Sequence, residues 1–356
     1  MSRPSPTVSV ITPVFNGAHL IAETLASLHA QHFDDFEAII VDDCSTDGTP
    51  DIVRAMIEAS GDTRFRLVRA AENGGPVKAR NLAVAQACGR YIAALDADDL
   101  CLPERLARQV AYLEAHADVV LVGTAAEVLD QGSVRASRLP SITTPALIEW
   151  MLQIGNPLVW SSVMMRADAA RALSPFTRPE RVYAEDFDLY HRLMPLGRIA
   201  RIDEPLLLYR HHGGGISKRF AERMHDAACA VLADAHRAIF GEAAEERCAL
   251  IVRHVMNRRP VPDRATLAAL GATLTAIQQA FFADRAPDRD DRRLIRWQTA
   301  RLWGDIGRAS IRAGAIGIAD AVAVRPDHLG MGYNRFDDLA VAQAIGGLRT
   351  MLRRNG

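Results

Sequence analysis

Lysine is scarce in this chain of 356 residues, and neither sign of charge dominates. Only Lys78 and Lys218 are lysines among the 42 basic residues, and the formal net charge is −1. The near-neutral balance excludes proteins that bind nucleic acid through bulk positive charge, so we expect no nucleic-acid partner.

Cysteine is also rare. The five cysteines are odd in number, widely scattered and contain no C-x-x-C pair. This spacing argues against a disulfide framework and against a zinc site, and it fits a reducing compartment. The residues concerned are Cys44, Cys88, Cys101, Cys229 and Cys248.

Long hydrophobic runs are missing, although 49% of the residues are hydrophobic. No uninterrupted apolar run approaches the roughly 20 residues that cross a bilayer, and no signal-type apolar core follows residues 1–6. We therefore expect a cytoplasmic protein. The length allows one large domain and a smaller one, each with its own core.

The sequence also lacks the glycine-rich loop that binds dinucleotides. Residues 8–13 alternate and are rich in β-formers, and the turn after them, T-P-V-F-N-G, holds the single glycine Gly17. A dinucleotide-binding dehydrogenase needs G-x-G-x-x-G at this point, so that class loses its main support. The first hundred residues nevertheless alternate strand and helix, which predicts a mostly parallel, doubly wound α/β sheet of the Rossmann kind.

The hydrophobic patterns predict further elements beyond this half-fold. Predicted strands cover residues 8–13, 36–41, 65–68, 91–95, 119–123, 156–165 and 205–209. Predicted helices cover residues 19–30, 50–60, 103–116, 146–151, 167–173 and 185–193, with another around 78–81 and a hairpin near 131–132. From residue 220 onward helical patterns replace strands. We therefore expect a first domain over 1–219 and a helical C-terminal extension over 220–356.

Carboxylates follow two of the predicted strands. Asp42 and Asp43 follow the second, and Asp96, Asp98 and Asp99 follow the buried strand at 91–95. Ligands collect at the carboxyl ends of parallel strands, and carboxylates there can hold a divalent cation that carries a diphosphate. Acidic residues of this kind also cap helices, and a helix opens near Pro103. The cluster alone leaves both interpretations open.

Two later stretches carry polar groups typical of a site. Glu185 and Asp186 fall in the first turn of a predicted helix, where the dipole alone favours carboxylates, but where one of them is also placed to accept a proton from a hydroxyl. The stretch around His211 and His212 precedes three glycines, which predicts a loop able to approach a ligand closely.

These stretches together resemble the inverting glycosyltransferases of GT-A family 2, the group that builds bacterial surface polysaccharides. The resemblance spans about residues 8–217. It rests on the ordered motifs TPVFNG, VDDCSTDGT, NGGPVKARN, LDADD, AEDFDLYHRL and YRHHGGGIS.

The resemblance implies a role for each matching position. Phe15 would stack on the base, Asp43 would accept its ring N–H, and Asp96 would lie near the ribose. The implied nucleotide-binding residues are Thr12, Pro13, Phe15, Asp43, Arg80 and Asp96. The implied ligands of Mn²⁺ or Mg²⁺ are Asp98, Asp96 and His212. The implied catalytic residues are Asp186, as general base, and Glu185 beside it.

The resemblance implies a metal-dependent transfer of a sugar from a nucleotide-diphosphate donor, most often a UDP-sugar, to a saccharide or a lipid-linked saccharide. A sugar nucleotidyltransferase is a rival, but it wants a Gly-rich loop with Arg or Lys after the first strand. A non-catalytic nucleotide-sugar-binding scaffold or sensor is the rival from another class. We expect pocket shape around residues 160–162 to govern the choice of donor.

The C-terminal extension leaves two questions open. Residues 297–329 look like one helix-turn-helix unit of the tetratricopeptide kind, which must pack on the first domain or on another subunit, giving a homo-oligomer. Arginines alternate with Leu, Ile and Trp between Arg292 and Arg301. This pattern is typical of a surface helix on its own core, and it is also compatible with peripheral contact at the inner face of an anionic membrane.

Overall fold

The computed structural model describes residues 5–136, 139–211, 220–326, 329 and 336–354. The chain divides into two compact units. The first holds Met1–Ile148 and Pro157–Met224, and the second holds Glu149–Asn156 and His225–Gly356. The helical region begins at α9 (Ala221–Phe240), close to the predicted residue 220.

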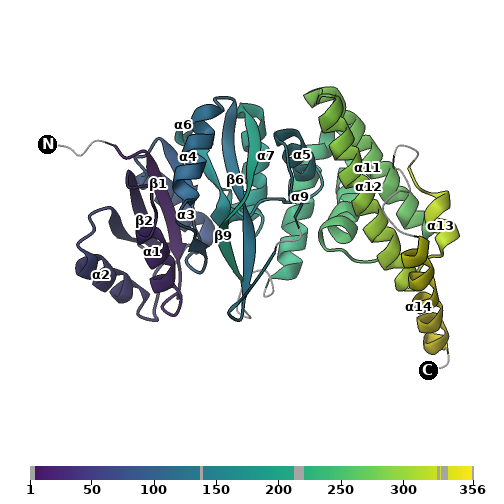
Figure 1. The fold of residues 1–356 in the computed structure, drawn as a ribbon, viewed down its shortest axis with the longest axis horizontal. Coiled ribbons are helices and arrows are strands. Elements are labelled where there is room, and N and C mark those ends of the chain that lie inside the picture. Colours follow the sequence, from purple (N-terminus) through teal and green to yellow (C-terminus); the bar gives the residue numbers. More distant parts are fainter. Residues whose placement is uncertain (1–4, 137–138, 212–219, 327–328, 330–335, 355–356) are drawn as a thin grey trace. The chain divides into compact units, whose positions relative to one another are not determined.

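One mixed sheet forms the centre of the first unit (Figure 1). Its order is β3-β2-β1-β4-β8-β6-β9-β5, with β7 paired to β6. Parallel pairing joins β3, β2, β1 and β4, and also β6 and β9, whereas β8, β5 and β7 run antiparallel to their neighbours. The strands are β1 (Val8–Val14), β2 (Phe36–Asp42), β3 (Phe65–Arg69), β4 (Tyr91–Ala94), β5 (Leu100–Cys101), β6 (Val119–Asp130), β7 (Ser133–Ala136), β8 (Met164–Arg166) and β9 (Arg198–His211).

Helices flank this sheet as the βαβ pattern predicts. Alternate residues of the central strands, such as Val10 of β1 and Ile40 of β2, share a core with Leu25 of α1 and Leu113 of α4. Helix α3 packs against β1 and β2. The helices of this unit are α1 (Ile21–His29), α2 (Thr49–Ser60), α3 (Gly75–Gln86), α4 (Arg105–Ala115), the first half of α5 (Pro145–Leu152), α6 (Ala167–Arg171) and α7 (Glu185–Leu193).

The first strand continues one residue past its predicted end at Pro13. The β1–β4 pairing stops at Ile11. Proline lacks an N–H, and on that side Pro13 has no ladder partner to lose. The chain therefore keeps its pairing with β2 as far as Val14.

The prediction of a strand over 156–165 was wrong for most of its length. Trp160–Ser162 form a 3₁₀ turn, in which the Ser162 hydroxyl donates to the Val159 carbonyl (2.7 Å), and only Met164–Arg166 pair as β8. Side-chain bonds to the backbone compete with a ladder in this way. Two strands were underestimated. The strand β9 is much longer than predicted, and β5 was missed because two residues give no periodicity.

The hairpin predicted near residues 131–132 is present between β6 and β7. Gln131 and Gly132 have φ values of 48° and 82°. Positive φ at both central residues matches the right-handed twist of the flanking strands.

The second unit is helical, as predicted for the C-terminal extension, and several of its buried polar side chains pair around Trp150 of α5. Trp150 Nε1 donates to Thr299 Oγ1 (3.0 Å), and Gln278 Nε2 donates to the same oxygen (3.1 Å). Its helices besides α9 are α10 (Ala244–Leu250), a π-helix (Ile251–Met256), α11 (Arg264–Arg285), α12 (Arg289–Arg312), α13 (Ile318–Ala323) and α14 (Phe336–Arg354).

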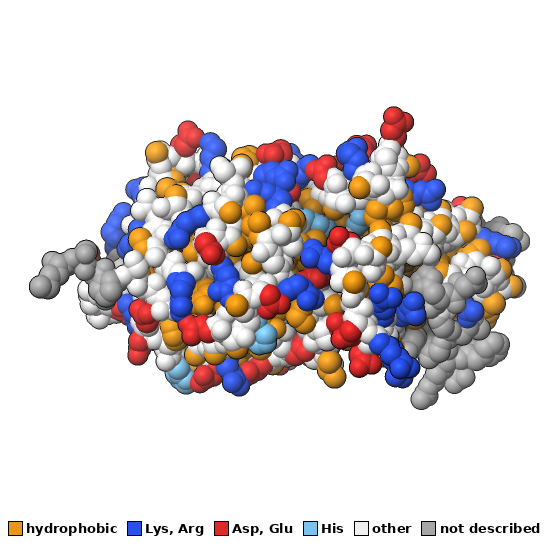
Figure 2. All heavy atoms as spheres, turned by 90° about the horizontal axis from the view of Figure 1, so that it is seen from above, with side chains coloured by type: hydrophobic (Ala, Val, Ile, Leu, Met, Phe, Trp, Pro, Cys, Tyr) orange, Lys and Arg blue, Asp and Glu red, His pale blue; other side chains and the backbone are white. Residues whose placement is uncertain are grey.

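Among the described residues, α11 is the one helix long and apolar enough to cross a membrane by length and composition. Leu267, Leu270, Leu274 and Ile277 of this helix are buried, at 1% exposure or less. A core helix passes the same test, and these side chains lie in the core of the second unit. On the face shown in Figure 2, basic and acidic side chains are interspersed, consistent with the net charge.

Candidate functional site

Two loops at the carboxyl ends of β1 and β2 hold each other. Asn16 adopts φ 52°, donates its N–H to Ser45 Oγ (2.8 Å) and accepts the Thr46 N–H at Oδ1 (2.9 Å). The next residue, Gly17, donates its N–H to Thr49 Oγ1 (2.9 Å). Beside this braced backbone Phe15 is 54% exposed, an unusual state for a phenylalanine and one suited to stacking on a ligand.

Asp43 is buried and organises the loop before α3. Its Oδ1 accepts the Gly74 N–H (2.9 Å), its Oδ2 accepts the Gly75 N–H (2.8 Å), and its carbonyl accepts from Asn73 Nδ2 (2.9 Å). Each carboxylate oxygen has two acceptor positions, so a lone pair remains on each for a ligand N–H. Asp43 thus has a structural partner that its sequence position did not reveal.

Arg80 lies at the centre of the site. Its Nη1 donates to Glu185 Oε1 (2.5 Å), its Nη2 donates to Asp96 Oδ1 (3.3 Å), and its guanidinium lies 4.5 Å from the centre of the Trp160 ring. Burial by itself lowers the pKa of Arg80, but the charges of Asp96, Glu185 and Asp186 outweigh it, and the net pKa is raised. One buried cation therefore joins the acidic turn after β4 to the first turn of α7.

The acidic turn after β4 is crowded with carboxylates. Burial raises the pKa of Asp96 despite the charge of Arg80, and the neighbouring Asp98 raises it further. Burial also holds the pKa of Asp99 well above its usual range, again with help from Asp98 and Asp96. Asp99 is 1% exposed, accepts the Arg210 N–H at Oδ1 (2.8 Å), and has no hydrogen-bond partner at Oδ2 among the described residues.

The alternative that Asp98 or Asp99 caps the next helix is not supported. Strand β5 separates the acidic turn from α4, whose N-terminal residue Glu104 makes no side-chain cap bond. Asp98 and Asp99 therefore lie outside the N-cap position of α4.

The first turn of α7 places Glu185 and Asp186 as predicted. Glu185 is buried, and its Oε2 has no hydrogen-bond partner in the described part of the chain. Asp186 is partly exposed and accepts the Phe187 N–H at Oδ1 (2.8 Å). One turn further on, the buried hydroxyl of Tyr190 has no hydrogen-bond partner among the residues that the structure describes, and burial holds its pKa well above the usual range, with a contribution from the charge of Asp186.

Unpaired buried polar atoms collect around Arg80. Such atoms are costly unless water or a ligand satisfies them, so their gathering in one place marks a functional site. Among the described residues these atoms are Arg80 Nε, Trp160 Nε1, Glu185 Oε2 and Tyr190 Oη. Thr12 Oγ1 in β1 and Asp99 Oδ2 in the acidic turn are also buried without a described partner. Sequence reasoning gave no role to Tyr190 or Arg210, because an interior tyrosine and a strand-end arginine have no local signal.

A divalent cation fits the acidic turn in its donor chemistry. Among the described residues no three His, Cys, Asp or Glu side chains gather as a metal cage. Mg²⁺ and Mn²⁺ at nucleotide sites take one or two carboxylates together with phosphate oxygens, so Asp96 and Asp98 suffice. A cation would also relieve the crowding that raises the pKa of Asp96. His212, the third predicted ligand, lies outside the described residues.

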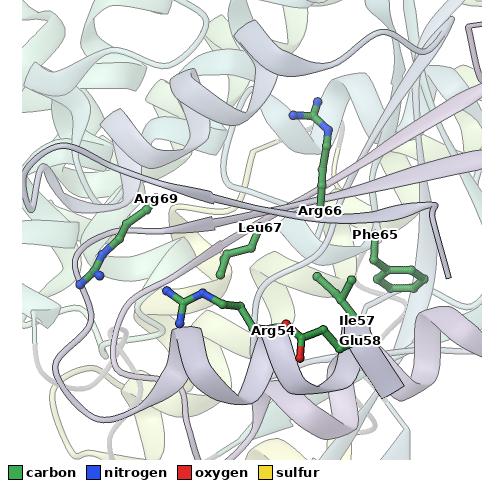
Figure 3. A pocket seen from close by; sticks show the side chains of 7 residues that line it. All are labelled: Arg54, Ile57, Glu58, Phe65, Arg66, Leu67 and Arg69. Atoms are coloured by element: carbon green, nitrogen blue, oxygen red, sulfur yellow. The ribbon is translucent and has the colours of Figure 1, made fainter. Parts of the chain in front are cut away.

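A separate hollow of about 330 Å³ lies at the edge strand β3 and is lined by none of the predicted site residues (Figure 3). Arg54, Ile57 and Glu58 of α2 face Leu67 and Arg69 of β3 across it. Arg54 is paired with Asp51 (2.5 Å), and Arg69 lies 3.6 Å from Asp42. We therefore assign the hollow no role in the site.

Comparison with known proteins gives a consistent picture. The sequence profile "Glycosyl transferase family 2" matches residues 9–172. EpsE of Bacillus subtilis strain 168, named as a glycosyltransferase, is 35% identical over 217 residues, which cover 60% of this chain and 76% of EpsE.

Solved structures agree in fold. Residues 1–349 of S. aureus TarS, in complex with UDP-GlcNAc, share 19% identity with a TM-score of 0.56, covering 95% of this chain and 90% of that one. The mannosyltransferase PcManGT of Pyrobaculum calidifontis, in complex with GDP-Man and Mn²⁺, shares 20% identity with a TM-score of 0.53, covering 98% and 87%. At these identities the structures carry an argument for fold alone.

Proposed function

Because the chain belongs to glycosyltransferase family 2, we propose that it is a metal-dependent, inverting enzyme that moves a sugar from a nucleotide-diphosphate sugar to a saccharide or lipid-linked saccharide acceptor. Residues 1–219 are the proposed catalytic domain and residues 220–356 its helical extension. The observation that carries the proposal is the bridge that Arg80 forms between Asp96 and Glu185, since it joins the proposed cation-binding turn to the turn of α7 that carries the candidate base Asp186.

The donor half of the site is proposed at the carboxyl ends of β1, β2 and β4. The exposed ring of Phe15 supports base stacking, and the free acceptor positions of Asp43 support a contact with a base N–H. Arg80 itself is covered by Trp160 and paired with two carboxylates, so its proposed role in nucleotide binding is to orient Asp96 near the ribose. Thr12 and Pro13 form the strand end beneath these contacts. UDP is the proposed nucleotide.

The acceptor half is proposed at the start of α7. Asp98, with Asp96 and His212, would hold Mn²⁺ or Mg²⁺, which when bound would neutralise the diphosphate leaving group. Asp186 would take the proton of the acceptor hydroxyl while that oxygen attacks the anomeric carbon from the face opposite the diphosphate, which inverts its configuration. Glu185, fixed by Arg80, would orient the helix turn that carries Asp186.

We further propose that the enzyme is cytoplasmic and takes part in the synthesis of cell-surface polysaccharide. If its acceptor is lipid-linked, it would work at the inner face of the membrane. Exposed aromatic and arginine side chains of α12 support peripheral contact, since Arg301 lies 4.8 Å from the ring centre of Trp297, which is 39% exposed. Absence of co-sedimentation with anionic liposomes would remove the membrane contact, and a monomer in solution would remove the proposed oligomer.

Thermal unfolding with UDP, GDP and dTDP, each with and without Mn²⁺, tests the proposal. A ligand that binds only the folded state stabilises it, by about 2.7 kcal/mol at a hundredfold excess over Kd. We expect Mn²⁺-dependent stabilisation by one nucleotide and its loss in Asp98→Ala. No stabilisation by any nucleotide would contradict the proposal. Stabilisation without transfer to any acceptor would favour the nucleotide-sugar sensor.

A further inference from the structure

We propose that Arg210 is a positioning residue, which fixes the acidic turn after β4 and so sets the affinity of that turn for a nucleotide-bound cation. The inference rests on the proposed function, because it takes the turn at residues 96–99 to be the cation site. Arg210 lies at the end of β9, and its side chain is 15% exposed.

Arg210 contacts the turn and α1 at once. Its Nε donates to the carbonyl oxygen of Asp98 (2.8 Å), and its backbone N–H donates to Asp99 Oδ1 (2.8 Å). Its Nη2 donates to Glu23 Oε2 on α1 (2.6 Å). A single side chain therefore joins β9 and α1 to the peptide unit of the proposed ligand Asp98.

Other contacts hold the neighbouring residues of the turn. Asp96 is held through its N–H by Ser161 Oγ (2.9 Å) and through its carboxylate by Arg80. Ala97 is held through its carbonyl by Thr24 Oγ1 of α1 (2.9 Å). Arg210 adds a contact to the main chain of Asp98 itself, beside its bond to the Asp99 carboxylate, so it holds the part of the turn that follows Ala97.

Geometry at metal ligands is sensitive to such supports. Groups that orient a ligand without touching the metal typically cost 10–100-fold in metal affinity when they are removed. The guanidinium also ties the Asp98 carbonyl to the Glu23 carboxylate on α1, so the turn is anchored to that helix before a cation arrives. A purely structural strand-end role is the rival, because the β5–β9 pairing, with Leu100 opposite Leu208, already joins the two segments.

Three substitutions separate these roles. Arg210→Lys keeps the charge and the backbone N–H but loses the planar fork that reaches the Asp98 carbonyl and Glu23 together. Arg210→Met removes the charge as well. Glu23→Gln, the matched control, weakens only the exposed contact with α1, which Thr24 backs up.

Calorimetric titration of UDP at a series of Mn²⁺ concentrations gives the readout, with GDP or dTDP in its place if one of those stabilises the wild type. We expect Arg210→Lys and Arg210→Met to weaken Mn²⁺-dependent binding by about 10–100-fold. Metal-free nucleotide binding should stay within about threefold of the wild type in both, and Glu23→Gln should stay within about threefold throughout.

The outcomes distinguish this inference from the function it rests on. Wild-type metal dependence in both Arg210 variants would overturn the inference and leave the proposed function standing. Equal losses with and without Mn²⁺, or unfolding of even the Lys variant at room temperature, would assign Arg210 a structural role and also overturn it. Absence of Mn²⁺-dependent binding in the wild type would overturn both.

Discussion

Two buried tryptophans, one in each unit, differ in how their indole N–H groups are paired. Trp150 in the second unit donates its indole N–H to Thr299, which also accepts from Gln278. Trp160 in the first unit is equally buried, carries Arg80 on its ring face, and leaves its N–H without a partner among the described residues. The first arrangement is what a stable core requires, whereas the second is incomplete as it stands.

The two tryptophans differ in whether protein groups alone complete their hydrogen bonds. Paired buried groups rigidify a core and need nothing more. Unpaired ones are tolerated where a ligand or ordered water completes them, and around Trp160 they stand beside Arg80, Glu185 and Tyr190. Substitutions in the first unit should therefore separate stability from activity, and substitutions in the second should change stability alone.

The largest expected effect is on activity. Asp186→Asn removes the proposed base while keeping the shape of the side chain, so we expect kcat to fall about 10²–10⁴-fold. Transfer assays with a true acceptor measure this, and nucleotide-induced stabilisation serves as the control for folding. Near-normal turnover would remove Asp186 from the mechanism.

Arg80→Met should produce the largest loss of stability. It leaves the buried Glu185 and the half-buried Asp96 without their cation, which costs about 3 kcal/mol in the free energy of unfolding. Urea denaturation measures the change. Arg301→Met, which removes an arginine from the exposed ring of Trp297, is the matched control and should cost less than about 1 kcal/mol. Equal losses in the free energy of unfolding for the two variants would show that the buried bridge stabilises the fold no more than an exposed arginine does.

Paired indole substitutions test the comparison directly. Trp150→Phe and Trp160→Phe delete the same atoms, but only the first breaks a hydrogen bond, so we expect it to cost about 1 kcal/mol more in the free energy of unfolding. Denaturant unfolding followed by circular dichroism gives both values. A larger loss for Trp160→Phe would mean that its N–H is already satisfied by ordered water.

The smallest effect concerns His236 in the second unit. Its Nε2 lies 2.7 Å from the Gln153 carbonyl, and burial lowers its pKa although that hydrogen bond opposes the shift. A lowered histidine pKa means that the folded state favours the neutral ring, so stability is full above the ordinary value near 6.5 and is lost as the pH falls through the folded pKa. His236→Gln should reduce the loss between pH 7.5 and pH 5 by on the order of 1 kcal/mol. An unchanged pH dependence would contradict the assignment.

Local periodicity was enough to predict much of this fold. The GT-A architecture is confirmed by likeness to TarS, and the elements up to residue 101 match except for β5. Prediction failed at residues 156–163, where side-chain bonds of Ser162 favour a 3₁₀ turn, and at β9, whose polar residues disguise a strand of 14 residues. The first error concerns a local competition between a side-chain bond and the ladder, and the second concerns a strand whose partners β6 and β5 are distant in the sequence.

For the site, the motifs located the acidic turn, the first turn of α7 and the loop at Asp43. They did not indicate that each carboxylate oxygen of Asp43 accepts one backbone N–H. Nor did they indicate that Arg210 donates to the carbonyl of Asp98, which lies 112 residues earlier in the sequence. The roles given to the predicted site residues remain proposals. His212 still awaits a test of its own.

The sequence by itself determined which strands end in carboxylates and which helix begins with Glu185 and Asp186, because strand and helix periods and turn residues act over a few positions. Only the tertiary structure decided that Arg80 joins two of these motifs and that Trp160 lies against it. The physical reason is burial: a buried guanidinium is stable only beside carboxylates, and here these come from segments that are far apart in the sequence. No single motif contains the information that brings these segments together.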